Sequence, residues 1–338
     1  MQSLKTVFFN VGFVYLSAVV LVFFSEKMYW YPSGGEMFEL AIFYAIPTFF
    51  LLWALSRFRV QRAAALFLAA ALFGLVTEGV LTTIIYEGGL LDPSTFAYAA
   101  LGWHGLISVM FGWYFLRKLL LRGKLFPVIV WSTVAGIFWG VWSPVYWLPE
   151  NLNNPDLLKP GVWTVSEFAV FALTITLVLA AAQWLLGKWF WQPSFNPGKK
   201  TVAIMTLVAL GYFGLTVMPV MPIIGTIKFA VLAALILWGL SRFRQKEVSG
   251  ETIFSQLHGE IHWLPLLGLF AMPLAAITVY ALALAIQPDE TVIRALSWNG
   301  IVTLQTLLGG GAFLAALITA ALPHRKNPLP LAPSNGIR

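Results

Sequence analysis

Apolar runs of about twenty residues recur from one end of this chain to the other, separated by short polar connections. A bilayer core about 30 Å thick needs roughly 20 apolar residues to cross it as a helix. Soluble domains are about a quarter charged, whereas 10% of these residues are charged and 59% are hydrophobic. The runs are continuous rather than alternating, which disfavours a β-barrel. We therefore predict an all-α, polytopic integral membrane protein.

The apolar runs divide the chain into ten predicted transmembrane helices. Their approximate bounds are 6–24, 38–56, 62–87, 96–116, 126–147, 163–184, 201–217, 225–240, 263–286 and 301–322. No polar stretch between them is long enough to fold as a separate soluble domain. We expect residues 1–322 to form a single transmembrane domain and the Pro-rich residues 323–338 to form a disordered cytoplasmic tail.

Basic residues lie almost entirely on one side of these predicted helices. Seventeen of the 21 lysine and arginine residues follow even-numbered helices or lie at the chain ends, with Arg117 and Arg122 among them. The positive-inside rule places such connections in the cytoplasm. We therefore predict a plasma-membrane protein with both termini in the cytoplasm. The net charge of +7 then indicates contact with the anionic lipid of the bilayer, and we expect no nucleic-acid partner.

Five ionisable residues fall within or at the edge of the predicted helices: Glu39, Glu78, His104, Glu167 and Lys228. Measured from the basic end of each helix, Glu78, His104 and Lys228 lie about 20–24 Å deep, and Glu39 and Glu167 about 27–31 Å. Ionisable groups in lipid are costly and face protein or water. These five are our candidate proton- or substrate-binding residues, with Glu78 first. The structural alternatives are a carboxyl that only locks helix packing and a lysine that extends to the outer interface.

Small residues mark the faces through which the helices should pack. Ala70 and Gly74 share a face with Glu78. Similar stripes, four residues apart, are Ala100, His104, Ser108 and Gly112 on the fourth helix, and Ser132, Gly136, Gly140 and Pro144 on the fifth. These stripes predict a core of helices three, four, five and eight around a polar pocket that opens outward. The run Gly309–Gly311 predicts a loosened or kinked tenth helix.

Several chemistries are excluded or disfavoured. Cysteine is absent, which excludes disulfides, thiolate metal sites and cysteine nucleophiles. The sequence contains no Walker-type loop, Rossmann fingerprint or HExxH motif. Residues 258–262 (HGEIH) hold two histidines, but the glutamate between them is not adjacent to either, unlike in zincin-type motifs. Only His104 lies well inside the membrane, so a pair of axial haem ligands is missing. We expect neither a metal nor a cofactor.

One heptapeptide recurs within the chain. Residues 53–59 (WALSRFR) are repeated as residues 238–244 (WGLSRFR), each at the basic end of an even-numbered predicted helix. A parallel duplication would superpose the first four helices on the last four. The alternative is that both helix ends are basic only because of their place in the membrane.

Three functions remain open from the sequence. The first is a transporter or permease for an unidentified substrate, with or without proton coupling, in which Glu78 is the protonatable group and His104 and Lys228 are its partners. The second is an intramembrane enzyme that acts on a lipid or isoprenoid substrate, with Glu78 and His104 as an acid–base pair. The third is a non-catalytic subunit or assembly factor of a membrane complex.

Overall fold

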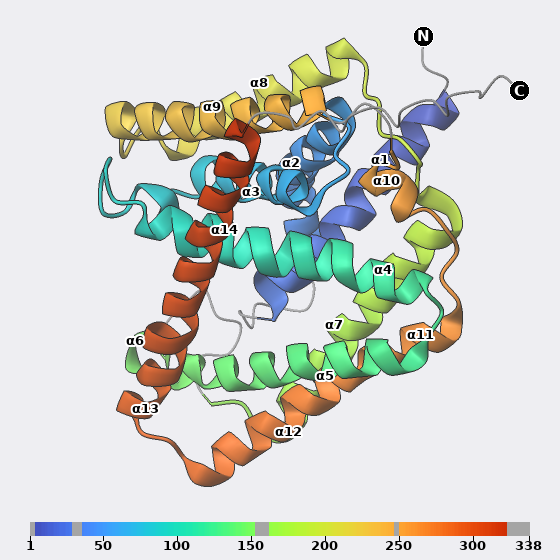
Figure 1. Ribbon diagram of the computed structural model, residues 1–338. Coiled ribbons are helices and arrows are strands. Elements are labelled where there is room, and N and C mark those ends of the chain that lie inside the picture. Colours follow the sequence, from blue (N-terminus) through green and yellow to red (C-terminus); the bar gives the residue numbers. More distant parts are fainter. Residues whose placement is uncertain (1–3, 29–35, 153–161, 247–249, 323–338) are drawn as a thin grey trace, which may run out of the picture.

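The computed structural model describes residues 4–28, 36–152, 162–246 and 250–322, and Figure 1 shows how its helices are arranged. Every regular element in these ranges is helical. Nine of the described helices are long and apolar enough to cross a membrane. The prediction of an all-α chain with many potential membrane spans is therefore confirmed. The predicted tail, 323–338, lies outside the described residues.

The longer helices follow the apolar runs closely. They are α1 (Leu4–Val22), α2 (Glu36–Arg57), α3 (Ala63–Val76), η4 (Phe96–Phe115), α5 (Leu125–Trp142), α7 (Val165–Leu185), α8 (Lys199–Thr216), α9 (Pro222–Lys246), α12 (Ala271–Ile286) and α14 (Thr303–Ala321). Shorter helical segments extend or connect them, namely η1 (Phe23–Lys27), η2 (Thr77–Leu81), η3 (Ile84–Tyr86), α4 (Leu116–Leu121), η5 (Ser143–Trp147), α6 (Pro149–Leu152), η6 (Leu186–Phe190), α10 (Ile253–Gln256), α11 (Trp263–Leu267), η7 (Gly268–Phe270), α13 (Glu290–Arg294) and η8 (Ala295–Val302).

Helix η4 is the central element of the fold. It packs against α3, α14, α1 and η1, and it crosses the middle of the molecule in Figure 1. Helix α5 lies along α12 on one side, whereas α8 and α9 run antiparallel on the other, joined by a short turn at residues 217–221. Helix α3 is almost wholly buried, which explains why its sequence is apolar on every face.

Small residues allow several of these helices to approach one another closely, as the stripes predicted. A Cβ atom added at Gly74 would lie 2.1 Å from the carbonyl oxygen of Ala100, where α3 meets η4. A Cβ at Gly136 would lie 2.1 Å from the carbonyl oxygen of Met272, where α5 meets α12. The predicted partners were partly wrong, because α5 packs mainly on α12 and the first helix joins the core. A stripe shows which face of a helix carries small side chains, but it does not show which other helix packs against that face.

We expect Gly74→Ala to destabilise the protein by about 2 kcal/mol, since the added methyl group meets backbone rather than a movable side chain. Gly311→Ala in α14 is the matched control, because a Cβ there meets no atom within 4 Å. The measurement is the midpoint of thermal unfolding in detergent. Equal midpoints for the two variants would contradict the close contact of α3 with η4.

The predicted seventh span, 201–217, forms helix α8, but α8 is not among the nine apolar helices. Lys199 and Lys200 occupy its first turn, and Ala209 is its one buried side chain among those described. These two lysines shorten the apolar length of the helix. The Gly309–Gly311 run does not interrupt α14, which is continuous through it, because Gly309 packs against the backbone of Ala97 and Gly102.

Candidate functional site

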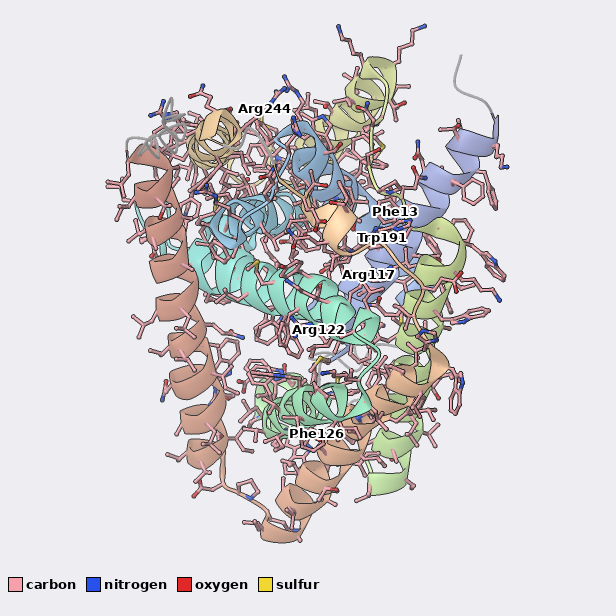
Figure 2. The ribbon with its side chains drawn as sticks, turned by 45° about the vertical axis from the view of Figure 1, so that its right-hand side comes forward. Phe13, Arg117, Arg122, Phe126, Trp191 and Arg244 are labelled. Atoms are coloured by element: carbon pink, nitrogen blue, oxygen red, sulfur yellow. The ribbon has the colours of Figure 1, made fainter. Side chains whose placement is uncertain are left out.

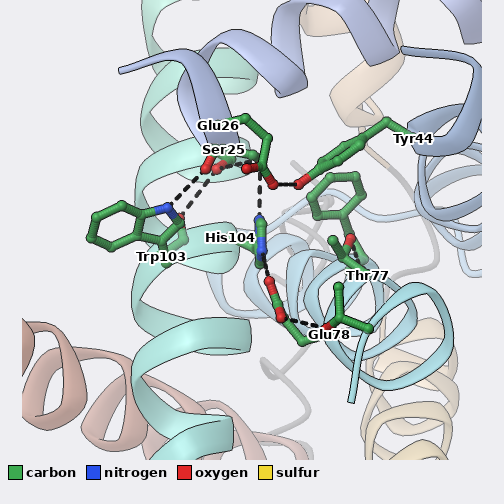
Figure 3. A network of polar contacts seen from close by, with 10 residues as sticks. Ser25, Glu26, Tyr44, Thr77, Glu78, Trp103 and His104 are labelled. Atoms are coloured by element: carbon green, nitrogen blue, oxygen red, sulfur yellow. Dashed lines mark hydrogen bonds and ion pairs between the residues drawn. The ribbon is translucent and has the colours of Figure 1, made fainter. Parts of the chain in front are cut away.

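Glu78 and His104, predicted from sequence as partners, are in direct contact in the structure. The Glu78 carboxyl Oε1 meets the His104 imidazole Nε2. Glu78 is 6% exposed and His104 is 1% exposed. The second carboxyl oxygen, Oε2, accepts a hydrogen bond of 2.8 Å from the Thr82 hydroxyl. Figure 3 shows this contact within a larger polar network.

The other imidazole nitrogen of His104 continues the network into the first helix. Nδ1 lies 3.1 Å from the Ser25 hydroxyl. That hydroxyl donates to Ser108 Oγ at 2.9 Å, and Ser108 Oγ donates in turn to the backbone carbonyl of Trp103 at 3.2 Å. The indole of Trp103 donates to the carbonyl oxygen of Ser25 at 2.9 Å. This ring of bonds joins η1 firmly to η4.

The arrangement of protons in the Glu78–His104 pair depends on the tautomer of His104. If the Ser25 hydroxyl donates to Nδ1, the imidazole carries its proton at Nε2 and donates it to the Glu78 carboxylate. If the Ser25 hydroxyl donates to Ser108 instead, Nδ1 is the donor to Ser25, and Nε2 meets the carboxyl group through a proton held by the carboxylic acid or by the imidazolium. In either tautomer, one proton is shared between Glu78 Oε1 and His104 Nε2.

A second carboxyl group lies beside this pair. The Tyr44 hydroxyl on α2 donates to Oε1 of Glu26 on η1, and the Tyr44 ring centroid is 6.3 Å from that of His104. Tyr44 is buried and Glu26 is partly buried. Helices α1–η1, α2, α3–η2 and η4 thus all contribute polar groups to one interior region. This region, Ser25, Glu26, Tyr44, Glu78, Thr82, His104 and Ser108, is called the polar network below.

The polar network is built on π-helical backbone. Ser25 and Glu26 lie in η1, Glu78 lies in η2, and His104 and Ser108 lie in η4, all three of which are π-helical. In a π-helix each amide bonds five residues back, a geometry that is rare and frequent at functional sites. The wider turn changes the angular position of each following side chain, so these residues leave the register that an α-helix would give them.

Three predicted candidates lie elsewhere. Lys228 on α9 does not reach Glu78; its ammonium donates to the carbonyl oxygens of Gly89 at 2.9 Å and Asp92 at 2.7 Å. Glu167 closes a capping box with Thr164 at the start of α7, and Glu39 is exposed on α2. The predicted depths of the five residues were positions along the axis of each helix. They did not specify the direction in which each side chain points.

Lys228 instead anchors the connection between η3 and η4. In that connection, hydrogen bonds from the backbone N–H and the side chain of Ser94 hold the pKa of the Asp92 carboxyl below its usual value.

We expect Lys228→Met, which removes two charge-assisted hydrogen bonds, to destabilise the protein by about 2–3 kcal/mol. The measurement is thermal unfolding, together with protease cleavage at residues 87–95. Unchanged cleavage and stability would contradict this anchoring.

Ser25, Glu26 and Tyr44 were not predicted as site residues. The sequence places the end of the first span near residue 24, so the Ser25–Glu26–Lys27 segment reads as an interfacial end. In the structure the helix continues through Lys27, and Ser25 and Lys27 are buried. An acid that directly follows an apolar run without a Gly or Pro break was the available signal.

Arg117, which belongs to a basic connection predicted to be cytoplasmic, does not extend into solvent in the structure. Its side chain is fully buried at the junction of α4, α7 and α10. Its Nε donates to the Leu257 carbonyl at 3.1 Å, Nη1 donates to Gln183 Oε1 at 3.2 Å, and the guanidinium lies 3.8 Å from the centre of the Trp191 ring. Figure 2 shows Arg117 beside Trp191 and Phe13.

The described residues contain no group of three or more His, Asp or Glu side chains arranged to hold a metal ion. The two histidines of residues 258–262 do not share a helical face, because this segment connects α10 to α11 without forming a helix.

The whole chain was also compared with known proteins. It matches no protein-family model, no curated protein and no solved structure.

Proposed function

We propose that this protein is a proton-coupled membrane transporter in which Glu78 and His104 hold the exchangeable proton. The observation that carries the proposal is the buried contact between the two side chains, which requires one shared proton. Ionisable groups at this depth are costly and are typical of proton and substrate pathways. Hydroxyl groups of Thr82 and Ser25 at either end of the pair extend the route by which a proton can move.

The chemistry of such a pair suits coupling. Desolvation favours a neutral carboxylic acid, whereas contact with a cation favours the carboxylate. A movement that separates η2 from η4 therefore changes the residue that holds the proton. The two residues lie on different helices, so a relative shift of these helices acts directly on their contact. A substrate that binds one of the two arrangements better would drive that shift.

The proposed orientation follows from charge. The basic connections after α2, α4, η6 and α9 face the cytoplasm of a plasma-membrane protein, in accord with the positive-inside rule. Helix α8 supplies a tenth crossing, since the apolar helix α9 follows it after a short turn and runs antiparallel to it. With ten crossings, both termini lie in the cytoplasm.

The test uses inside-out vesicles from cells that produce the protein, with an acidic interior and a pH-sensitive quenched dye. Pools of amino acids, sugars, organic cations and organic anions are added in turn. A substrate–proton antiporter releases protons and restores fluorescence with one pool. A symporter, tested in vesicles without the initial acidification, carries protons inward with one pool and quenches the dye. The Glu78→Gln variant, matched for expression, is expected to give no response to that pool. If no pool changes fluorescence in either assay, or if Glu78→Gln responds equally, the proposal is wrong.

A second candidate is an intramembrane enzyme acting on a lipid or isoprenoid substrate. One observation favours it, namely an apolar cavity of about 330 Å³ whose lining includes Gly102, Leu106, Trp131 and Gln305. Gly102 and Leu106 lie two residues before and after His104 on η4. The cavity therefore borders the helix that carries His104, although residues two positions apart on a helix face different directions. Chemical change of a lipid extract incubated with the protein, lost in His104→Gln, would support the enzyme over the transporter.

A further inference from the structure

The basic ends of α2 and α9 and the start of α8 enclose a cavity of about 530 Å³. Four cationic side chains line it: Arg57 and Arg59 from the end of α2, Lys199 from the start of α8, and Arg244 from α9. No acidic residue is among its described lining residues. Residues of both copies of the heptapeptide thus line one cavity, with Arg244 the single residue from the second copy, and the two copies adopt different conformations. Arg59 follows α2 in the left-handed region at φ 50°, whereas Arg244 remains helical.

This arrangement suits a phosphate group. Arginine guanidinium groups bind phosphate oxygens in a two-pronged geometry, and a lysine adds a further positive charge. Membrane topology explains why the residues are basic, but it does not explain why they surround a cavity. Arg122 and Lys124 have the same topology and are exposed, but they line neither this cavity nor the apolar cavity beside η4.

An apolar groove adjoins the cationic cavity. It has a volume of about 360 Å³ and shares Phe195 and Pro197 with the cavity. Its walls are formed by α1, from Val7 to Tyr15, by α2 and by the first turns of α8. The nine residues from Val7 to Tyr15 extend about 12 Å along α1, which is most of one membrane leaflet. The groove therefore runs from the basic end toward the centre of the membrane.

From these two adjoining spaces we infer that the protein binds one anionic lipid, with its phosphate headgroup among Arg57, Arg59, Lys199 and Arg244 and an acyl chain in the groove along α1 and α2. A free phosphate would use the cavity but not the groove. A neutral lipid would use the groove but would supply no negative charge to the four cations, and the described lining residues include no acid. The inference is independent of the proposed transport activity, because the polar network lines neither space.

The test is native mass spectrometry of the purified full-length protein with dioleoyl phosphatidylglycerol. Dioleoyl phosphatidylcholine is the zwitterionic probe, and glycerol phosphate is the headgroup without a tail. We expect one phosphatidylglycerol per protein, bound several-fold more tightly than phosphatidylcholine. We also expect glycerol phosphate to compete only at far higher concentration. Competition by glycerol phosphate at the concentration of the lipid would mean that the cavity binds a free anion, and would overturn the lipid assignment.

Two matched pairs of variants locate the binding. Arg57→Gln with Arg244→Gln should weaken phosphatidylglycerol binding at least fivefold, whereas Arg122→Gln with Lys124→Gln removes the same charge elsewhere and should not. Equal weakening by both pairs would show a general charge effect and would overturn the site. Lys199→Gln, a single exposed change, repeats the test if the double variant unfolds.

The groove is tested in the same way. Val11→Trp fills it, whereas Val170→Trp places the same side chain on an exposed position of α7. Weaker lipid binding by Val11→Trp alone supports the inference, and equal binding by both variants contradicts it.

Discussion

Glu78→Gln is expected to fold normally and to lose proton-coupled transport, down to the level of protein-free vesicles. Glutamine has the size of glutamate, and its amide can still meet His104 Nε2 and accept from Thr82. It cannot ionise, so the shared proton of the pair cannot be exchanged. We therefore expect unfolding midpoints close to the wild type but no fluorescence response to the substrate pool. A carboxyl band that changes with pH in infrared difference spectra of the wild type should also be absent from the variant.

Two other carboxyl groups serve as controls for Glu78. Glu39→Gln and Glu167→Gln remove acids from the exposed face of α2 and from the capping box of α7. Both variants should keep the transport response and the infrared band. A Glu78→Gln protein that loses stability and transport in parallel would instead support a packing role, as in a non-catalytic subunit of a membrane complex.

Arg117→Ala is expected to cause the largest loss of stability, about 3–5 kcal/mol. The substitution leaves a cavity in a fully buried site. It also leaves the Leu257 carbonyl and the Gln183 amide without their donor, and unpaired buried polar groups are costly. The stacking of the guanidinium on Trp191 is lost as well. Since Arg117 connects α4, α7 and α10, we expect the effect to appear as cooperative unfolding rather than local fraying.

The measurement for Arg117 is thermal and denaturant unfolding of the purified protein. Arg117→Lys keeps the charge but lacks the planar fork that reaches two acceptors, and it should be intermediate. Arg122→Ala, an exposed change five residues later (Figure 2), should be close to the wild type. An Arg117→Ala protein as stable as Arg122→Ala would contradict the structural role described for this residue.

Several features could be predicted without coordinates because they depend only on the order of residues along a single helix. Apolar length identifies the helices, and the position of Glu78 and His104 along their helices follows from counting residues at a constant rise. Small residues such as Gly74 and Gly136 mark faces of close approach, and both faces are closely packed in the structure. These properties belong to each helix by itself, so no knowledge of its neighbours is needed.

The remaining features depend on which helices meet and at what angle. Lys228 was predicted at nearly the depth of Glu78, but its helix directs it to the carbonyl groups of Gly89 and Asp92. Arg117 follows an apolar run at its basic end, but α7 and α10 cover it. The π-helical turns of η1, η2 and η4 rotate side chains away from the positions that counting at α-helical spacing predicts.

The sequence by itself determined the all-helical class, the long apolar helices and the two central residues of the polar network. Only the tertiary structure decided that Ser25 and Glu26 join them, that Lys228 does not, and that two distant copies of one heptapeptide line a single cavity. The physical reason is that composition and periodicity act within a helix. Partner choice and side-chain direction arise from packing between helices, to which residues far apart in the chain contribute together.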